Sequence, residues 1–260
     1  MTLIQAILIG CVAALTQLEG DWLGECKLRE PVITGFLVGL IMGDVQKGLM
    51  IGGALQLMWM GATNIGPTAG LDIGSGGTIG AAVALMTGSD LEIAVAFAIP
   101  VAVVVQMVNI LKMTTFSGLM HKADAYIEEG KDKKAIGIHY LCGLVTFLIY
   151  FTFTFVVLFV GDSVINAIVN SIPEWVHGGL GAVATVLPAM GFALLLNLLW
   201  ETKLIPYFVI GFIFAAYLGV SMVGICALSI AIAAVIYMLK ADQLKGNAQV
   251  DIAVDDEWED

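Results

Sequence analysis

Long apolar runs separated by short polar connections dominate this chain. Three of them, residues 91–111, 138–160 and 179–199, are long enough to cross a bilayer as helices, because a helical span needs about 20 residues. The run 204–239 is too long for a single span, and we expect it to break near Gly219–Ser221 into two segments. This pattern predicts an all-α polytopic membrane protein.

The other apolar runs are shorter than a span and cover residues 2–18, 31–42, 48–62 and 73–88. A helix of about twelve residues reaches only about 18 Å. Gly43, Asp44 and Lys47 lie between the second and third of these runs, so the pair predicts a short re-entrant helical hairpin that turns inside the membrane. Two tilted helices of mismatched length are the alternative.

The stretch Gly48–Gly80 combines membrane hydrophobicity with ten glycines and several polar side chains. Hydrocarbon offers no partner to a loosened backbone, so such a segment persists at membrane depth only inside protein or beside a water-filled cavity. Polar side chains are costly there and mark candidate functional sites. We therefore expect the ligand site within the glycine-rich region 31–88.

A helix over residues 48–63 would place Gly48, Gly52, Gln56, Trp59 and Thr63 on one face. An aromatic surface beside a few fixed hydrogen-bonding groups is suited to a neutral polyhydroxylated ligand. Substrate binding by Gln56, Trp59 and Thr63 is therefore one interpretation. The other is a glycine-rich packing face on which Gln56 bonds a neighbouring helix.

More candidate residues lie beyond the expected end of this helix and in the loop before residue 31. Pro67 disfavours helix at the residue before it, so Asn64 and Thr68 can face a cavity. Asp72 could bind sugar hydroxyls, a cation or a lysine, and a capping or turn role is the alternative for Asn64 and Asp72. Glu25 joins the candidate site if its charged loop folds inward.

Charge and motifs narrow the function classes. The formal net charge is −11, but seven of the 22 acidic residues follow Lys240, which predicts an acidic, disordered tail over residues 241–260. The sequence has no basic patch with interleaved aromatic residues, so we expect no nucleic-acid partner. It also lacks the motifs of hydrolases, phosphate-cradling loops and metal-ligand sets, so we predict no catalytic residue, metal or cofactor.

The connection 112–134 carries five lysines. The positive-inside rule places this connection in the cytoplasm. If four segments follow it, the tail 241–260 is cytoplasmic too. We therefore expect one membrane domain over residues 1–240.

The segment EPVITGFLVGLIMGDVQKGLMIGGALQLMWMGATNIGP, followed by AFAIPVAVVVQ and the lysine-rich connection, resembles a known family. It is similar to the IIC membrane subunit of the mannose/fructose/sorbose family of the bacterial phosphoenolpyruvate-dependent sugar phosphotransferase system (PTS). The similarity runs through residues 1 to about 240 in order and without large gaps.

This resemblance implies a multi-pass permease in the bacterial cell membrane that is not an enzyme on its own. Such a subunit pairs with a IID membrane subunit, in a trimer of heterodimers, and carries sugar inward by an elevator-like movement. Cytoplasmic IIA and IIB subunits then phosphorylate the sugar, and some family members are bacteriocin receptors. Gln56, Asn64 and Asp72 fall where the family places sugar-contacting residues, and Glu25 is a further candidate.

Two departures from the family bear on the substrate. Mannose- and sorbose-type relatives have glutamate where this chain has Gln56, and Trp59 replaces a small residue. The resemblance therefore points to a hexose other than mannose or to an amino sugar. A self-contained, ion-coupled secondary transporter that uses the Asp72 carboxylate is the alternative function.

Overall fold

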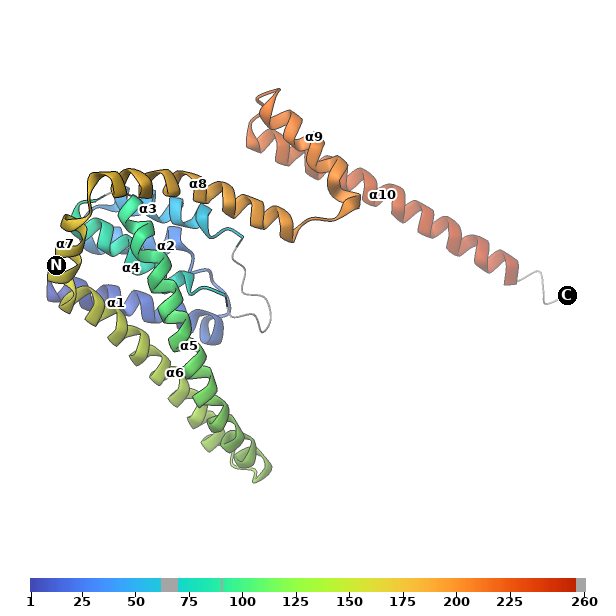
Figure 1. Cartoon of the computed structure of the whole chain (residues 1–260). Coiled ribbons are helices and arrows are strands. Elements are labelled where there is room, and N and C mark those ends of the chain that lie inside the picture. The colour runs from blue at the N-terminus through green and yellow to red at the C-terminus, as the bar shows by residue number, and fades with distance from the viewer. Residues whose placement is uncertain (62–69, 90, 256–260) are drawn as a thin grey trace. The chain divides into compact units, whose positions relative to one another are not determined.

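The computed structural model describes residues 1–61, 70–89 and 91–255, except for the side chains of Asp21, Asp162 and residues 241–255. In these parts of the chain all regular structure is helical, which confirms the predicted fold class (Figure 1). The chain divides into two compact units, Met1–Leu198 and Leu199–Asp260. The α-helices are α1 (Leu3–Leu18), α2 (Pro31–Met42), α3 (Val45–Met58), α4 (Ile73–Thr87), α5 (Leu91–Glu128), α6 (Asp132–Phe155), α7 (Asp162–Ser171), α8 (Glu174–Leu198), α9 (Ile205–Ala216) and α10 (Met222–Asp255).

Four helical segments of the described chain are long and apolar enough to cross a membrane. They are Leu91–Glu128, Asp132–Val160, Glu174–Leu198 and Met222–Lys240. The first two contain the predicted spans 91–111 and 138–160, and the third covers all but the last residue of the predicted span 179–199. The fourth follows the predicted break in the run 204–239, which the structure confirms between Ala216 and Met222, with Gly219 in a left-handed conformation (φ +61°).

The lysine-rich connection 112–134 is not a separate segment between two helices. Instead α5 continues to Glu128 and α6 begins at Asp132, so the two helices run side by side to a short turn at Gly130 (φ +69°) (Figure 1). Lys, Glu and Ala are good helix formers, so a loss of hydrophobicity does not by itself end a helix. The amphipathic helix α7 was also missed, because it is short and lies between two apolar runs.

α2 and α3 form the predicted short helical hairpin. Gly43 ends α2 in a left-handed conformation (φ +86°), and the Asp44 side chain accepts a hydrogen bond from the Lys47 N–H at 3.0 Å to cap α3. The helices meet through glycines, because a Cβ added at Gly48 would lie 2.5 Å from the carbonyl oxygen of Gly35. The turn of this hairpin inside the membrane stays a prediction.

α4 lies at the centre of the first unit and packs against α1, α2 and α5. Every residue from Gly74 to Ala84 is buried. Small side chains permit this close packing: a Cβ added at Gly80 would lie 2.7 Å from the Cβ of Ala98 on α5. The N-terminal turn of α4 is therefore held from several sides, and the candidate site is built around it.

The second unit, Leu199–Asp260, contains α9 and α10. α9 spans only 12 residues, in line with the predicted division of the run 204–239. The single membrane domain over 1–240 and the disordered tail over 241–260 stay predictions.

Candidate functional site

Asp72 is the buried centre of the candidate site. Its side chain caps α4, because Oδ1 accepts a hydrogen bond from the Ser75 N–H at 2.8 Å. The other carboxylate oxygen accepts a hydrogen bond from the side-chain amide of Gln17 on α1. The residue is 5% exposed, and its own N–H points to the Ala102 carbonyl of α5 at 3.4 Å. The capping alternative is therefore realised, and the carboxylate also joins α4 to α1.

Gln56 closes the open end of the α2–α3 hairpin. Its side-chain amide donates to the carboxylate of Glu30, the residue just before α2. Its side-chain oxygen accepts from the Val32 N–H at 3.5 Å. This bonding matches the interpretation of Gln56 as a link between neighbouring helices, and it leaves a half-buried amide and carboxylate side by side.

Trp59 is buried, with 6% of its surface exposed. Its indole reaches α4, since a Cβ added at Gly76 would lie 3.1 Å from the ring. The expected helix over 48–63 is wrong in its end point, because α3 stops at Met58 and Trp59 has a non-helical backbone (φ −98°, ψ 9°). Early termination follows from the sequence that comes next, where Gly61 begins a glycine- and proline-containing segment.

Glu25 lies in a loop that folds back on itself. Its side chain is 56% exposed and bonds the Arg29 guanidinium; this hydrogen bond, together with the charge of Arg29, holds the pKa of the Glu25 carboxyl below its usual value. Gly24, Glu25 and Lys27 all have left-handed backbone conformations, at φ +77°, +58° and +67°. Such strain in residues other than glycine is concentrated at functional segments in proteins.

Glu19 shows that the loop before α2 is more than a solvated surface. It lies in the π-helical turn Glu19–Leu23 after α1 and is fully buried. Its Oε2 accepts the Arg29 N–H at 2.7 Å and lies 3.9 Å from Arg29 Nε. Its Oε1 has no hydrogen-bond partner among the described residues. A fully buried carboxylate oxygen without a partner is a strong acceptor available to a rearranged loop or a ligand.

Asp72, Thr16 and Arg29 meet at the first turn of α4, and Gln17 and Glu19 bond to Asp72 and Arg29 there. A Cβ added at Gly74 would lie 2.7 Å from the Thr16 hydroxyl and 3.2 Å from the Cβ of Arg29. The end of α1 and the start of α2 therefore both abut this turn. We define the polar cluster as Gln17, Glu19, Arg29, Glu30, Gln56 and Asp72, with Trp59 packed beside it.

The sequence identified Gln56, Trp59 and Asp72 in this region but missed the other members of the polar cluster. Glu19, Arg29 and Glu30 belong to a charged segment, and such segments are usually solvated, so neither the burial of Glu19 nor the contacts of Arg29 and Glu30 had a local signal. Thr63, Asn64 and Thr68 lie outside the described residues, and their place in the site stays a prediction. Among the described residues no group of acidic, histidine and cysteine side chains could hold a metal ion.

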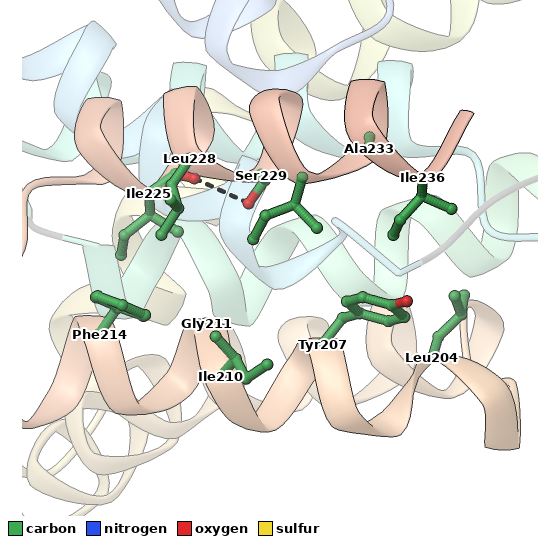
Figure 2. A pocket seen from close by; sticks show the side chains of 11 residues that line it. Leu204, Tyr207, Ile210, Gly211, Phe214, Ile225, Leu228, Ser229, Ala233 and Ile236 are labelled. Carbon is green, nitrogen blue, oxygen red and sulfur yellow. Dashed lines mark hydrogen bonds between the residues drawn. The ribbon is translucent and has the colours of Figure 1, made fainter. Parts of the chain in front are cut away.

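A cavity in the unit Leu199–Asp260 has a different character from the polar cluster. Side chains of α9 and α10 face one another across a groove of about 430 Å³ (Figure 2). Its polar side chains are Tyr207 and Ser229, and the Ser229 hydroxyl donates to the Ile225 carbonyl at 2.8 Å. A groove with so few polar groups does not match the hydroxyls of a sugar, so the polar cluster is the better candidate.

Comparison with known proteins places the chain among sugar permeases. The family described as the PTS system sorbose-specific IIC component matches residues 3–235. The PTS system sorbose-specific EIIC component of Lacticaseibacillus casei is 30% identical over 236 residues, covering 90% of this chain and 84% of that protein. The N-acetylgalactosamine permease IIC component 1 of Escherichia coli strain K12 is 28% identical over 221 residues, covering 85% and 82%.

A solved structure is similar as well. The cryo-electron microscopy structure of the mannose transporter ManYZ in complex with microcin E492 contains a chain that is 28% identical to this one. It superposes with a TM-score of 0.58 and covers 92% of this chain and 96% of that chain.

Proposed function

The chain belongs to the sorbose-specific IIC family of the PTS, and from this premise we propose that it binds a hexose or an amino sugar at the polar cluster. As a member of this family it is a multi-pass membrane permease component, a translocation subunit rather than a catalyst on its own. The sugar, the partner subunits and the movement are parts of the proposal.

The observation that carries the proposal is the burial of Asp72 beside other hydrogen-bonding groups in a largely apolar unit. A carboxylate can accept hydrogen bonds from two sugar hydroxyls, and hydrogen bonds to charged groups are the stronger ones. One Asp72 oxygen is bonded to the Gln17 side chain, a neutral partner that a sugar hydroxyl can replace. Trp59 adds an aromatic wall to this region.

The polar side chains of Gln56 and Glu30 bear on which sugar is bound. Gln56 and Glu30 together offer an amide donor and carboxylate acceptors, whereas a glutamate at position 56 would offer acceptors alone. An amide can donate to a ring substituent that carries an acceptor, such as an N-acetyl group. The named substrate of the Escherichia coli N-acetylgalactosamine permease supports the amino-sugar option, and the sorbose-specific relative supports a hexose.

We propose that translocation requires a IID membrane subunit, in a trimer of heterodimers, and that it proceeds as a rigid-body elevator movement. Cytoplasmic IIA and IIB subunits would phosphorylate the delivered sugar. The similarity to ManYZ supports a multi-subunit transporter, and its complex with microcin E492 supports a secondary role as a bacteriocin receptor. The tight glycine-mediated packing of α2, α3 and α4 supports movement as a unit.

The test compares two aspartates that cap helices. Asp72→Asn and Asp44→Asn both keep a side-chain oxygen for the helix cap, because Asn caps about as well as Asp. The chain is co-expressed with IID, and sugar affinity is measured by calorimetry on the purified membrane complex. We expect Asp72→Asn to weaken binding about tenfold or more, since hydrogen bonds to charged groups are stronger. Asp44 is exposed, so Asp44→Asn should bind normally.

Unchanged affinity in Asp72→Asn would place the sugar elsewhere. Uptake by cells that also contain IIA and IIB separates the two functional classes. A PTS permease requires phosphoenolpyruvate. Uptake that is independent of phosphoenolpyruvate and collapses with the ion gradient would instead establish the ion-coupled transporter that uses Asp72.

A further inference from the structure

A separate pocket of about 330 Å³ lies between α5 and α6, with the π-helical turn after α1 at one side. It shares no lining residue with the polar cluster. Residues at i, i+4 and i+8 of α5, namely Lys112, Phe116 and Met120, line one wall. His139, Cys142 and Thr146 of α6 line the facing wall.

The deep part of this pocket contains a buried cation. Lys112 is 7% exposed, and its ammonium lies 5.3 Å from the centroid of the Tyr150 ring. Thr146 and Cys142 beside it are buried as well, with 2% and 8% exposure. None of the described residues that line the pocket is acidic. The charge of Lys112 also acts on Asp72, so this ammonium already has partners within the protein, and a ligand would share its three donors with them.

Aromatic and thioether side chains form the outer part of the pocket. The Trp22 ring lies 5.7 Å from the His139 ring and directly over Gly143, where an added Cβ would be 1.9 Å from the indole. Met113 and Met120 are exposed, at 57% and 41%. A buried cation at the bottom and an apolar rim match a ligand with an anionic head and an apolar stem.

The position of the pocket along the two helices indicates how deep in the membrane the ligand would bind. Lys112 directly follows the apolar run 91–111, and His139 stands at the start of the run 138–160. Beyond the pocket, the two helices continue to a tip that carries Lys122, Lys131, Lys133 and Lys134. Both helices therefore leave the hydrocarbon at this level, where basic pockets between membrane helices receive lipid headgroups.

We propose that this pocket binds the phosphate of an amphiphilic anion, and that an anionic phospholipid of the cytoplasmic leaflet supplies it. The headgroup phosphate would contact Lys112, and an acyl chain would follow the methionine rim. A free phosphorylated sugar has the same phosphate chemistry but lacks the apolar stem. The inference does not depend on the identity of the transported sugar.

The test measures lipid retention and thermal protection on the full-length chain co-expressed with IID. Purified complex is mixed with phosphatidylglycerol, with phosphatidylcholine of the same acyl chains, or with glucose 6-phosphate. Lys112→Met removes the buried charge, and Lys122→Met is the control at an exposed lysine of the same helix. Ser117→Asp places a carboxylate at the exposed rim of the pocket and leaves Lys112 and Asp72 unchanged.

We expect native mass spectrometry to find phosphatidylglycerol retained by the unaltered chain and by Lys122→Met. Retention should fall about fivefold or more in Lys112→Met and Ser117→Asp. If Lys112→Met fails to fold, the retention measured for Ser117→Asp tests the proposal by itself. Equal retention of phosphatidylglycerol in all variants, or equal protection by phosphatidylcholine, would overturn the proposal. Protection by glucose 6-phosphate without any by phosphatidylglycerol would overturn the lipid source.

Discussion

At the scale of single residues, the contact between Gln56 and Glu30 has the clearest consequence. The amide of Gln56 donates to a carboxylate that stands just before α2. A glutamate at position 56, as the resemblance gives for mannose- and sorbose-type relatives, would face Glu30 as a like charge. The contact between positions 30 and 56 therefore requires an amide at one of the two positions.

We predict that Gln56→Glu destabilises the protein at neutral pH by about 1–3 kcal/mol, because a half-buried hydrogen bond is replaced by two facing carboxylates. Two ionised carboxylates repel each other, so we expect the destabilisation to be larger at pH 7.5 than at pH 5. Thermal unfolding at the two pH values measures the difference.

Gln46→Glu is the control for this substitution, since Gln46 is an exposed residue of the same helix. It should unfold like the unaltered chain at both values of pH. A Gln56→Glu protein as stable as the control at pH 7.5 would show that position 56 does not face Glu30.

At the scale of elements, the α2–α3 hairpin depends on backbone contact between glycines. Gly48 and Gly52 of α3 pack on Gly35 and Gly39 of α2, and any added Cβ would meet backbone atoms that cannot rotate away. Gly53 stands on the same helix, and a Cβ added there would have no other heavy atom within 4 Å. One helix thus contains both kinds of glycine.

We predict opposite effects for alanine at these two kinds of position. In Gly48→Ala the new Cβ would be 2.5 Å from the Gly35 carbonyl, so the hairpin must separate, at a cost of about 1–3 kcal/mol. Gly53→Ala should be neutral or stabilising by up to about 1 kcal/mol, because alanine favours helix. Thermal unfolding of the two variants in detergent checks the difference; equal midpoints would contradict the hairpin packing.

Some elements of the fold could be predicted from the sequence and others could not. The α2–α3 hairpin and the break before α10 follow from local residues, namely glycines between apolar runs. The end of α3 at Met58, the helical course of residues 112–128 and the presence of α7 were not predicted. Hydropathy indicates which segments can lie in the membrane. The ends of helices depend instead on capping and on the residues that follow.

At the scale of the whole molecule, the lengths of the helices determine on which side of the membrane the C-terminal tail lies. A cytoplasmic tail requires an even number of crossings after the lysine-rich tip of α5 and α6. Among the described helices that follow this tip, α6, α8 and α10 are long enough to cross alone, while α9 has only 12 residues. The predicted topology therefore requires α9 to cross as a short span, which local thinning of the bilayer allows.

We predict that positions 131 and 245 lie on the same, cytoplasmic side. In a variant whose native cysteines are replaced by serine, Lys131→Cys and Lys245→Cys should react with a membrane-impermeant maleimide only after permeabilisation. Labelling of position 245 in intact cells, with position 131 protected, would mean that α9 does not cross.

The apolar pattern by itself determined that this chain is a helical multi-pass membrane protein and where most of its helices lie. Backbone groups in hydrocarbon must bond within their own helix, so local composition records each span. Tertiary structure alone decided which charged residues are buried. Gln17 and Asp72 are 55 residues apart, and Gln56 and Glu30 are 26 apart, so no local pattern links them. Their pairing follows from the packing of α1, α2 and α3 around the first turn of α4.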